Sequence, residues 1–183
     1  MSKRSFFAIL LLSAGLAGSA LAEDSAAKPD ESHPAHASGT TTKAFGPWSL
    51  HCQPPHQEGA EPLCVIAQTV ESSSNKLLAV ISIGHQHPSD PYNIVVTLPP
   101  NVAFPSSVHI RTGEQDKWGV ELPWQRCIPG ACIAGAELSP ATLVHWAGLQ
   151  TEGKIVFVVG SGDEVAVPIS MRGFGDAYTA LNK

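Results

Sequence analysis

An alternation of apolar and polar residues with a period of two recurs through this chain after residue 44, and it constrains the fold more than any other feature. Large apolar residues stand at every second position from Tyr92 to Leu98, and the pattern returns from Trp118 to Trp124. In an extended strand this spacing gathers the apolar side chains on one face. Two further runs, Leu77 to Ile83 and Ile155 to Val159, are apolar on both faces and suit central strands. Together these patterns predict a mainly antiparallel all-β domain.

Turn residues and helix signals refine this fold class. Gly160 to Asp163 separates two strand patterns and predicts a β-hairpin. Ser139 followed by Pro140 is typical of a helix N-terminus. Residues 174–181 carry large apolar side chains at the i, i+4 and i+7 positions of one helical face. We therefore expect a β-sandwich or compact barrel, with one or two short helices late in the chain.

The first 22 residues have the features of a cleavable secretory signal. Lys3 and Arg4 precede an apolar run that ends near Leu16, and Ala20 and Ala22 are the small residues that signal peptidase requires. The run is shorter than the roughly 20 residues of a transmembrane helix. We therefore expect an exported protein, periplasmic, outer-membrane-associated or secreted, with no transmembrane segment after cleavage.

Composition and charge describe the remainder of the chain. Residues 23–43 contain no large apolar residue, which predicts a disordered tether before a single domain at residues 44–183. Loss of the signal removes Lys3 and Arg4, so that 9 basic and 16 acidic residues remain and the net charge falls from −5 to −7. This acidic balance argues against nucleic acid as a partner and against simple electrostatic binding to anionic lipid.

Four cysteines remain after the signal, namely Cys52, Cys64, Cys127 and Cys132. An even number in an exported chain predicts disulfides, for which three connectivities exist. Proximity in sequence favours Cys52–Cys64 and Cys127–Cys132. The later pair lacks the Cys-x-x-Cys spacing of redox motifs, and a four-cysteine zinc site would need two close pairs. Structural disulfides are therefore favoured over redox chemistry and over metal binding.

The chain shows no constellation of catalytic residues. A Gly-x-Ser-x-Gly elbow is absent after residue 22, and neither a P-loop nor a dinucleotide-binding fingerprint occurs, so we expect no enzyme and no cofactor. His85-x-His87 is the most metal-like feature, but a catalytic zinc site needs a third protein ligand. A periplasmic metal-binding protein or an enzyme that uses this region is the alternative hypothesis.

Binding residues usually lie on loops that a rigid scaffold positions. Here the candidate loops are Gln53–Leu63 and Gly84–Pro91, and the strand pattern adds two outward side chains from residues 108–111. The candidate binding surface therefore consists of His56, His85, His87, His109 and Arg111.

Several short motifs follow one another in a specific order. They are Phe45-Gly46-Pro47-Trp48 with Cys52, Cys64-Val65-Ile66-Ala67-Gln68, Leu98-Pro99-Pro100-Asn101-Val102, Cys127 and Cys132 with Ile133-Ala134, Val167-Pro168-Ile169-Ser170, and Gly173-Phe174 with Ala177 and Leu181. In this order they resemble the invasion-associated locus B (IalB) family of exported α-proteobacterial proteins, over nearly all of residues 45–183. The resemblance implies a β-rich periplasmic or outer-membrane-associated domain, from a family named for a role in host-cell invasion. It implies no enzymatic activity and no catalytic residues.

We therefore expect an exported, non-enzymatic envelope-associated protein that acts by contact with a protein partner, in the envelope or on a host cell.

Peptide mapping of the non-reduced exported protein tests the cysteine pairing. We expect one pair of peptides joined through Cys52 and Cys64 and a second joined through Cys127 and Cys132, because local closure is favoured by sequence proximity. Each disulfide stabilises the folded state because it restricts the unfolded chain. For a loop the size of that between Cys52 and Cys64, this contributes about 3 kcal/mol. Four free thiols in that material would contradict the pairing.

Overall fold

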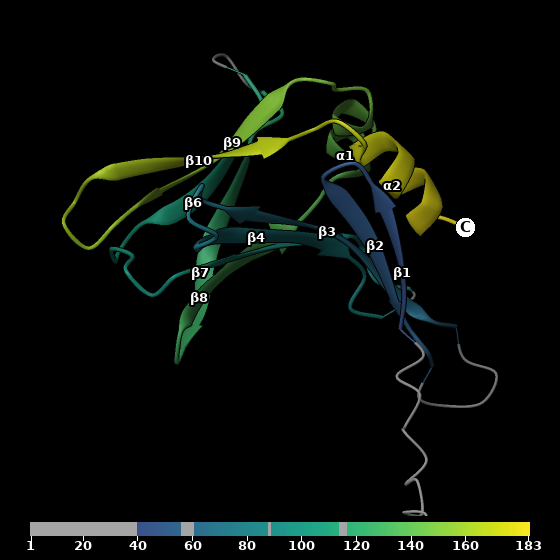
Figure 1. Ribbon diagram of the computed structural model, residues 1–183, viewed down its shortest axis with the longest axis horizontal. Coiled ribbons are helices and arrows are strands. Elements are labelled where there is room, and N and C mark those ends of the chain that lie inside the picture. Colours follow the sequence, from purple (N-terminus) through teal and green to yellow (C-terminus); the bar gives the residue numbers. More distant parts are fainter. Residues whose placement is uncertain (1–39, 56–60, 88, 114–116) are drawn as a thin grey trace, which may run out of the picture. The chain divides into compact units, whose positions relative to one another are not determined.

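The computed structural model describes residues 40–55, 61–87, 89–113 and 117–183. Within them, ten strands form one sheet and two short helices stand late in the chain (Figure 1). The elements are β1 (Thr41–Phe45), β2 (Trp48–Gln53), β3 (Leu63–Glu71), β4 (Leu77–Gly84), β5 (Asn93–Leu98), β6 (Ser107–Arg111), β7 (Val120–Ile128), β8 (Ala131–Glu137), α1 (Pro140–Ala147), β9 (Glu152–Val158), β10 (Glu164–Ser170) and α2 (Phe174–Leu181). The predicted signal lies outside the described residues. In the described part of the chain, no helix has the length and apolar character needed to cross a membrane.

The sheet is antiparallel at every pairing and has the order β1-β2-β3-β4-β5-β8-β7-β6-β9-β10. Its long strand β7 pairs with β6 through residues 120–123 and with β8 through residues 124–128. A register shift between Trp124 and Arg126 separates the two halves, and such a bulge bends a strand. The sheet curls into a half-barrel (Figure 1), which confirms the predicted all-β class. Strand β1 begins at Thr41, inside the segment predicted as tether.

The period-two alternation becomes the core of the domain. In β4, Ala79, Ile81 and Ile83 have no exposed surface, whereas Leu78 and Val80 on the other face are half-buried. Full burial of such an aliphatic side chain contributes about 1.5 to 3 kcal/mol. The run that is apolar on both faces therefore lies in a central strand, between β3 and β5, as its composition predicts.

Local signals produce the predicted helix start and hairpin. The Ser139 hydroxyl accepts a hydrogen bond from the Thr142 amide at 3.0 Å, and Pro140 follows as the first residue of α1. In the turn between β9 and β10, the Val159 amide donates to the Asp163 carbonyl at 2.9 Å, and Gly162 adopts a φ of +92°. Glycine favours that left-handed conformation because it has no Cβ.

The side chain of Gln68 on β3 links the third strand of the curled sheet to the last strand, β10. Gln68 is 4% exposed, and its amide nitrogen donates to the Ser170 carbonyl of β10 at 2.9 Å. Its amide oxygen accepts from the Ser170 backbone N–H, also at 2.9 Å. The Trp48 indole N–H donates to the same carbonyl at 2.7 Å. A buried amide thus satisfies both backbone groups of one residue in a strand from the other end of the sheet.

The contact of Gln68 and Trp48 with Ser170 is named here the joint of the sheet. The helix α2 starts shortly after Ser170, at Phe174. Gly173 has a φ of +82°, and a Cβ at this position would overlap the carbonyl oxygen of Phe45. Glycine therefore allows the β1–β2 turn to approach the start of α2. The next residue, Phe174, has no exposed surface and meets the Trp48 ring edge-on at 5.0 Å.

The structure divides the four tryptophans by burial. Trp48 and Trp146 are fully buried, but Trp118 and Trp124 are half-buried. Trp118 precedes β7 in a turn and stacks on His145 of α1 at 4.8 Å. The alternating pattern predicts a strand from Trp118 onward, but β7 begins at Val120, so the prediction was wrong for Trp118.

Replacing Gln68 by leucine tests the joint. Leucine has a side chain of similar volume but cannot accept the hydrogen bond from the Ser170 N–H. We therefore expect the free energy of unfolding to fall by about 2 kcal/mol. For a domain of this size that loss lowers Tm by roughly 4 to 8 °C. Differential scanning calorimetry measures it. Thr69→Val, on the exposed face of the same strand, is the matched control and should stay within about 0.5 kcal/mol; equal stability of both variants contradicts the role of Gln68.

Candidate functional site

Both predicted disulfides are present, and each joins directly opposite residues of two antiparallel strands. Cys52 of β2 faces Cys64 of β3, and Cys127 of β7 faces Cys132 of β8. No cysteine remains free. All four cysteines are therefore oxidised, and each disulfide crosslinks two neighbouring strands.

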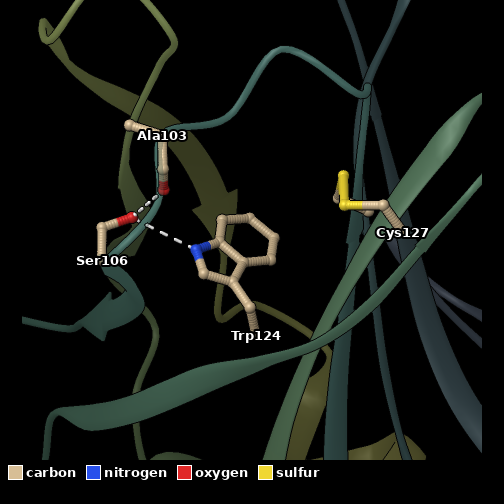
Figure 2. Close-up of a disulfide and its surroundings, with 5 residues drawn as sticks. Ala103, Ser106, Trp124 and Cys127 are labelled. Atoms are coloured by element: carbon tan, nitrogen blue, oxygen red, sulfur yellow. Dashed lines mark hydrogen bonds between the residues drawn. A yellow bond between two sulfur atoms is a disulfide. The ribbon is translucent and has the colours of Figure 1, made fainter.

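The second disulfide stands beside a short hydrogen-bond chain (Figure 2). The Trp124 indole N–H donates to the Ser106 hydroxyl at 3.2 Å, and that hydroxyl donates to the Ala103 carbonyl at 2.5 Å. The Ala103 amide in turn donates to the Val158 carbonyl of β9 at 2.9 Å. These bonds hold the connection between β5 and β6 against the sheet. Their role is structural, since each polar atom is already occupied by its neighbour.

The first disulfide borders a cleft of about 420 Å³, whose lining includes Cys64. It is named here the His85–Tyr92 cleft. Its walls come from the start of β3, from the connection between β4 and β5, and from the end of α2. The lining residues are Glu61, Pro62, Leu63, Cys64, His85, Tyr92, Leu181, Asn182 and Lys183.

Asp90 orients both histidines of the predicted His85-x-His87 feature. Nδ1 of His85 lies 2.6 Å from the Asp90 carbonyl oxygen, and because a carbonyl only accepts, this nitrogen carries the proton. Nδ1 of His87 lies 2.7 Å from the Asp90 carboxylate. His85 also packs on the Tyr92 ring, with a centroid distance of 3.7 Å. His85 therefore presents Nε2 as its remaining polar atom, while His87 stays exposed beside the cleft.

Tyr92 connects the cleft to the C-terminal helix. Its hydroxyl donates to the side-chain oxygen of Asn182 at 2.9 Å, and its ring meets Tyr178 edge-on at 5.8 Å. Burial raises the pKa of the Tyr92 phenol above its ordinary value, and the neighbouring Tyr178 raises this pKa further. The neutral phenol is therefore the form that the fold favours.

The remaining predicted residues lie elsewhere. His109 and Arg111 are on β6, which is separated from β4 in the sheet by β5, β8 and β7. They alternate with fully buried Val108 and Ile110, so they point to the outer face, as expected. His56 lies outside the described residues. The structure thus brings His85 and His87 together, and it places His109 and Arg111 at a second location.

The strand β2 contains a serine–histidine contact that was not predicted from the sequence. The Ser49 hydroxyl lies 2.8 Å from Nε2 of His51, and Nδ1 of His51 lies 3.2 Å from the Thr42 hydroxyl on β1. The i, i+2 spacing in a strand was the available signal, because it places both side chains on one face. Ser49 and its neighbours pair with β1 and β3 on both sides, so the ladder uses the backbone N–H groups that an oxyanion hole would need. This arrangement is a hydrogen-bond chain across strands.

Metal ligation was the alternative for His85 and His87. Among residues 40–55, 61–87, 89–113 and 117–183, no group of three or more His, Cys, Asp or Glu side chains is close enough to hold an ion. The His85–Tyr92 cleft offers instead an aromatic surface, an imidazole nitrogen, an amide and groups of both charges. Such a lining can bind another molecule through packing and hydrogen bonds.

These features define a β-domain, a curled antiparallel sheet with two cross-strand disulfides. The sequence profile of the invasion associated locus B (IalB) protein family matches residues 48–182, and the chain belongs to this family. The crystal structure of invasion associated protein B from Bartonella henselae has a similar fold, with a TM-score of 0.66 at 17% sequence identity. The alignment covers 78% of this chain and 95% of that chain. No curated protein sequence matches the chain significantly.

A spectrophotometric titration tests the environment of Tyr92. The protein has two tyrosines, so Tyr178→Phe leaves Tyr92 as the single phenol. Because burial is the larger cause of the raised pKa, we expect the folded variant to titrate above pH 10.0 and the unfolded variant in guanidinium to titrate at about the ordinary value. The stabilisation linked to this group is complete below the unfolded pKa and is lost as pH rises through the folded pKa. A folded midpoint at or below the unfolded one contradicts the assignment.

Proposed function

We propose that this IalB-family protein is an exported, non-enzymatic binding protein of the cell envelope, and that it docks a protein partner at the His85–Tyr92 cleft. The carrying observation is the cleft itself, whose walls come from three segments that are far apart in sequence and fixed by different contacts. Contact with a host cell, in keeping with the name of the family and of the Bartonella henselae protein, is the finer form of this proposal.

The walls of the cleft are held in place before any partner arrives. Cys64 is bonded to Cys52, His85 is bonded to the Asp90 carbonyl, and Asn182 is bonded to Tyr92. A preorganised surface binds with less loss of conformational entropy than a mobile one. The cleft is therefore better suited to recognition than the turns at the opposite ends of the same strands.

One edge of the cleft also exposes an apolar side chain. Leu63 at the start of β3 is 36% exposed and lines the cleft together with Pro62. Apolar and aromatic side chains surrounded by polar groups are typical of the centre of a protein interface. Leu63 and Tyr92, together with the polar residues that line the same cleft, therefore provide an apolar anchor with polar surroundings.

Several observations support export. Two disulfides form and persist in oxidising compartments, and both are structural here. The amino-terminal 22 residues carry the pattern of a secretory signal. A location in the periplasm, at the outer membrane or in the medium agrees with this chemistry and with the family.

Site-specific photocrosslinking in intact cells tests the docking surface. A benzoylphenylalanine placed at Leu63 should yield a discrete adduct with one envelope or host-cell protein, since the edge of the cleft contacts the partner. Leu77 is the matched control, because it is 43% exposed and stands at the other end of β4, about 23 Å from the Gly84 end.

The two positions separate docking from general stickiness. An adduct from position 63 that disappears in a His85→Ala, Tyr92→Ala double variant, with none from position 77, is the expected result. Equal adducts from both positions, or none from either in cells and in mixtures with host cells, would remove the cleft as the docking surface.

A further inference from the structure

Two cations stand directly opposite each other on the outer face of the sheet. Arg111 of β6 pairs in register with Lys154 of β9, and both side chains are exposed. Like charges in directly opposite positions destabilise a strand pair. His109, the preceding outward residue of β6, is half-buried beside them. This pairing of like charges is unfavourable, and it occurs in a chain in which carboxylates outnumber cations, with a formal net charge of −5.

Neither cation is neutralised by a carboxylate in the described part of the chain. The ion pair found there joins His87 and Asp90, far along the sheet order from β6 and β9. Elsewhere, Lys43 lies over the Phe45 ring and Lys117 over the Trp118 ring. Within residues 40–55, 61–87, 89–113 and 117–183, the donor groups of Arg111 and Lys154 are therefore not used by a carboxylate.

Two shallow hollows of about 340 and 360 Å³ meet at Arg111. Both hollows are also lined by Gly113, around which the space is open, and the smaller one reaches Gly119. The absence of side chains at these two positions leaves the guanidinium accessible from two sides. Val156, opposite His109 and 3% exposed, gives the larger hollow an apolar floor.

The larger hollow also contains two carboxylates that form no ion pair with its cations. Glu152 lies two residues before Lys154 on the same face of β9, and Glu164 lies on β10. By contrast, Glu121 in the smaller hollow accepts a hydrogen bond from the Ser107 hydroxyl at 2.7 Å. The larger hollow therefore presents separate positive and negative groups side by side.

We propose that this hollow binds a zwitterion that carries a phosphate and an ammonium group, of the phosphoethanolamine type. Arg111 and Lys154 hold the phosphate, and Glu152 holds the ammonium. The site is independent of the His85–Tyr92 cleft, since it is built on other strands and on the outer face of the sheet.

Charge and spacing both select this class of ligand. At neutral pH a phosphate carries one negative charge as a diester and between about −1.5 and −2 as a monoester, so two adjacent cations suit a phosphate and most of all a monoester. The guanidinium supplies a planar fork of donors to phosphate oxygens, and the lysine supplies a point charge. Alternate residues of a strand are about 6.6 Å apart, so Glu152 stands within reach of an ammonium two carbons from a phosphate held at Lys154.

Isothermal titration calorimetry with O-phosphoethanolamine and ethyl phosphate tests the site, because these probes differ by the amine. We expect the purified protein to bind phosphoethanolamine more tightly, and Glu152→Gln to remove the preference. Arg111→Gln and Lys154→Gln should each weaken binding of both probes by about fivefold to tenfold. Arg126→Gln removes the same charge from another exposed strand position and should leave the affinities unchanged.

A second arm identifies the source of the ligand. Flotation with phosphatidylcholine vesicles, with and without phosphatidylethanolamine, shows whether the head group on a membrane is bound. Retention on the phosphatidylethanolamine vesicles assigns the site to a lipid, and binding of the soluble ester without retention assigns it to a soluble ligand. Equal affinity for the two soluble probes, or no binding of either up to about 10 mM, overturns the proposal.

Discussion

The curled sheet depends on the amide of Gln68, which bonds both backbone groups of Ser170. An open sheet of ten strands has two free edges, here β1 and β10, and the bulge in β7 bends the sheet without fixing its final curvature. Gln68 sets that curvature because its two hydrogen bonds hold the end of β10 over β3. The Trp48 indole adds a third bond to the same residue, and α2 then packs its first aromatic ring against Trp48. The position of α2 in turn forms one wall of the His85–Tyr92 cleft.

This joint explains which sequence motifs carry the family resemblance. Four motifs from the two ends of the domain supply Phe45, Trp48, Gln68, Ser170 and Gly173, and these residues meet where β10 approaches β3. These five residues therefore serve the fold, whereas the cleft and the outer face are lined by other residues. Proteins that share a fold can differ in what they bind.

Much of the fold could be predicted because its signals are local. The alternation of apolar residues, the Ser139 cap, the Gly160–Asp163 turn and both disulfides each depend on residues that are at most 12 positions apart. The pairing of Gln68 with Ser170 and that of Arg111 with Lys154 depend on strand order and register, which no short segment contains. For the same reason the candidate surface could be named residue by residue, but its division between two places could not be foreseen.

The contact between Tyr92 and Asn182 has a practical consequence for anyone who handles this protein. Asn182 and Lys183 line the cleft, so any peptide joined after Lys183 starts at its mouth. An affinity tag or fluorescent reporter fused there competes with a docking partner for the same space. The exposed turn at Ser161–Asp163, which connects β9 and β10 at the far end of the strand order, is a better position for a label.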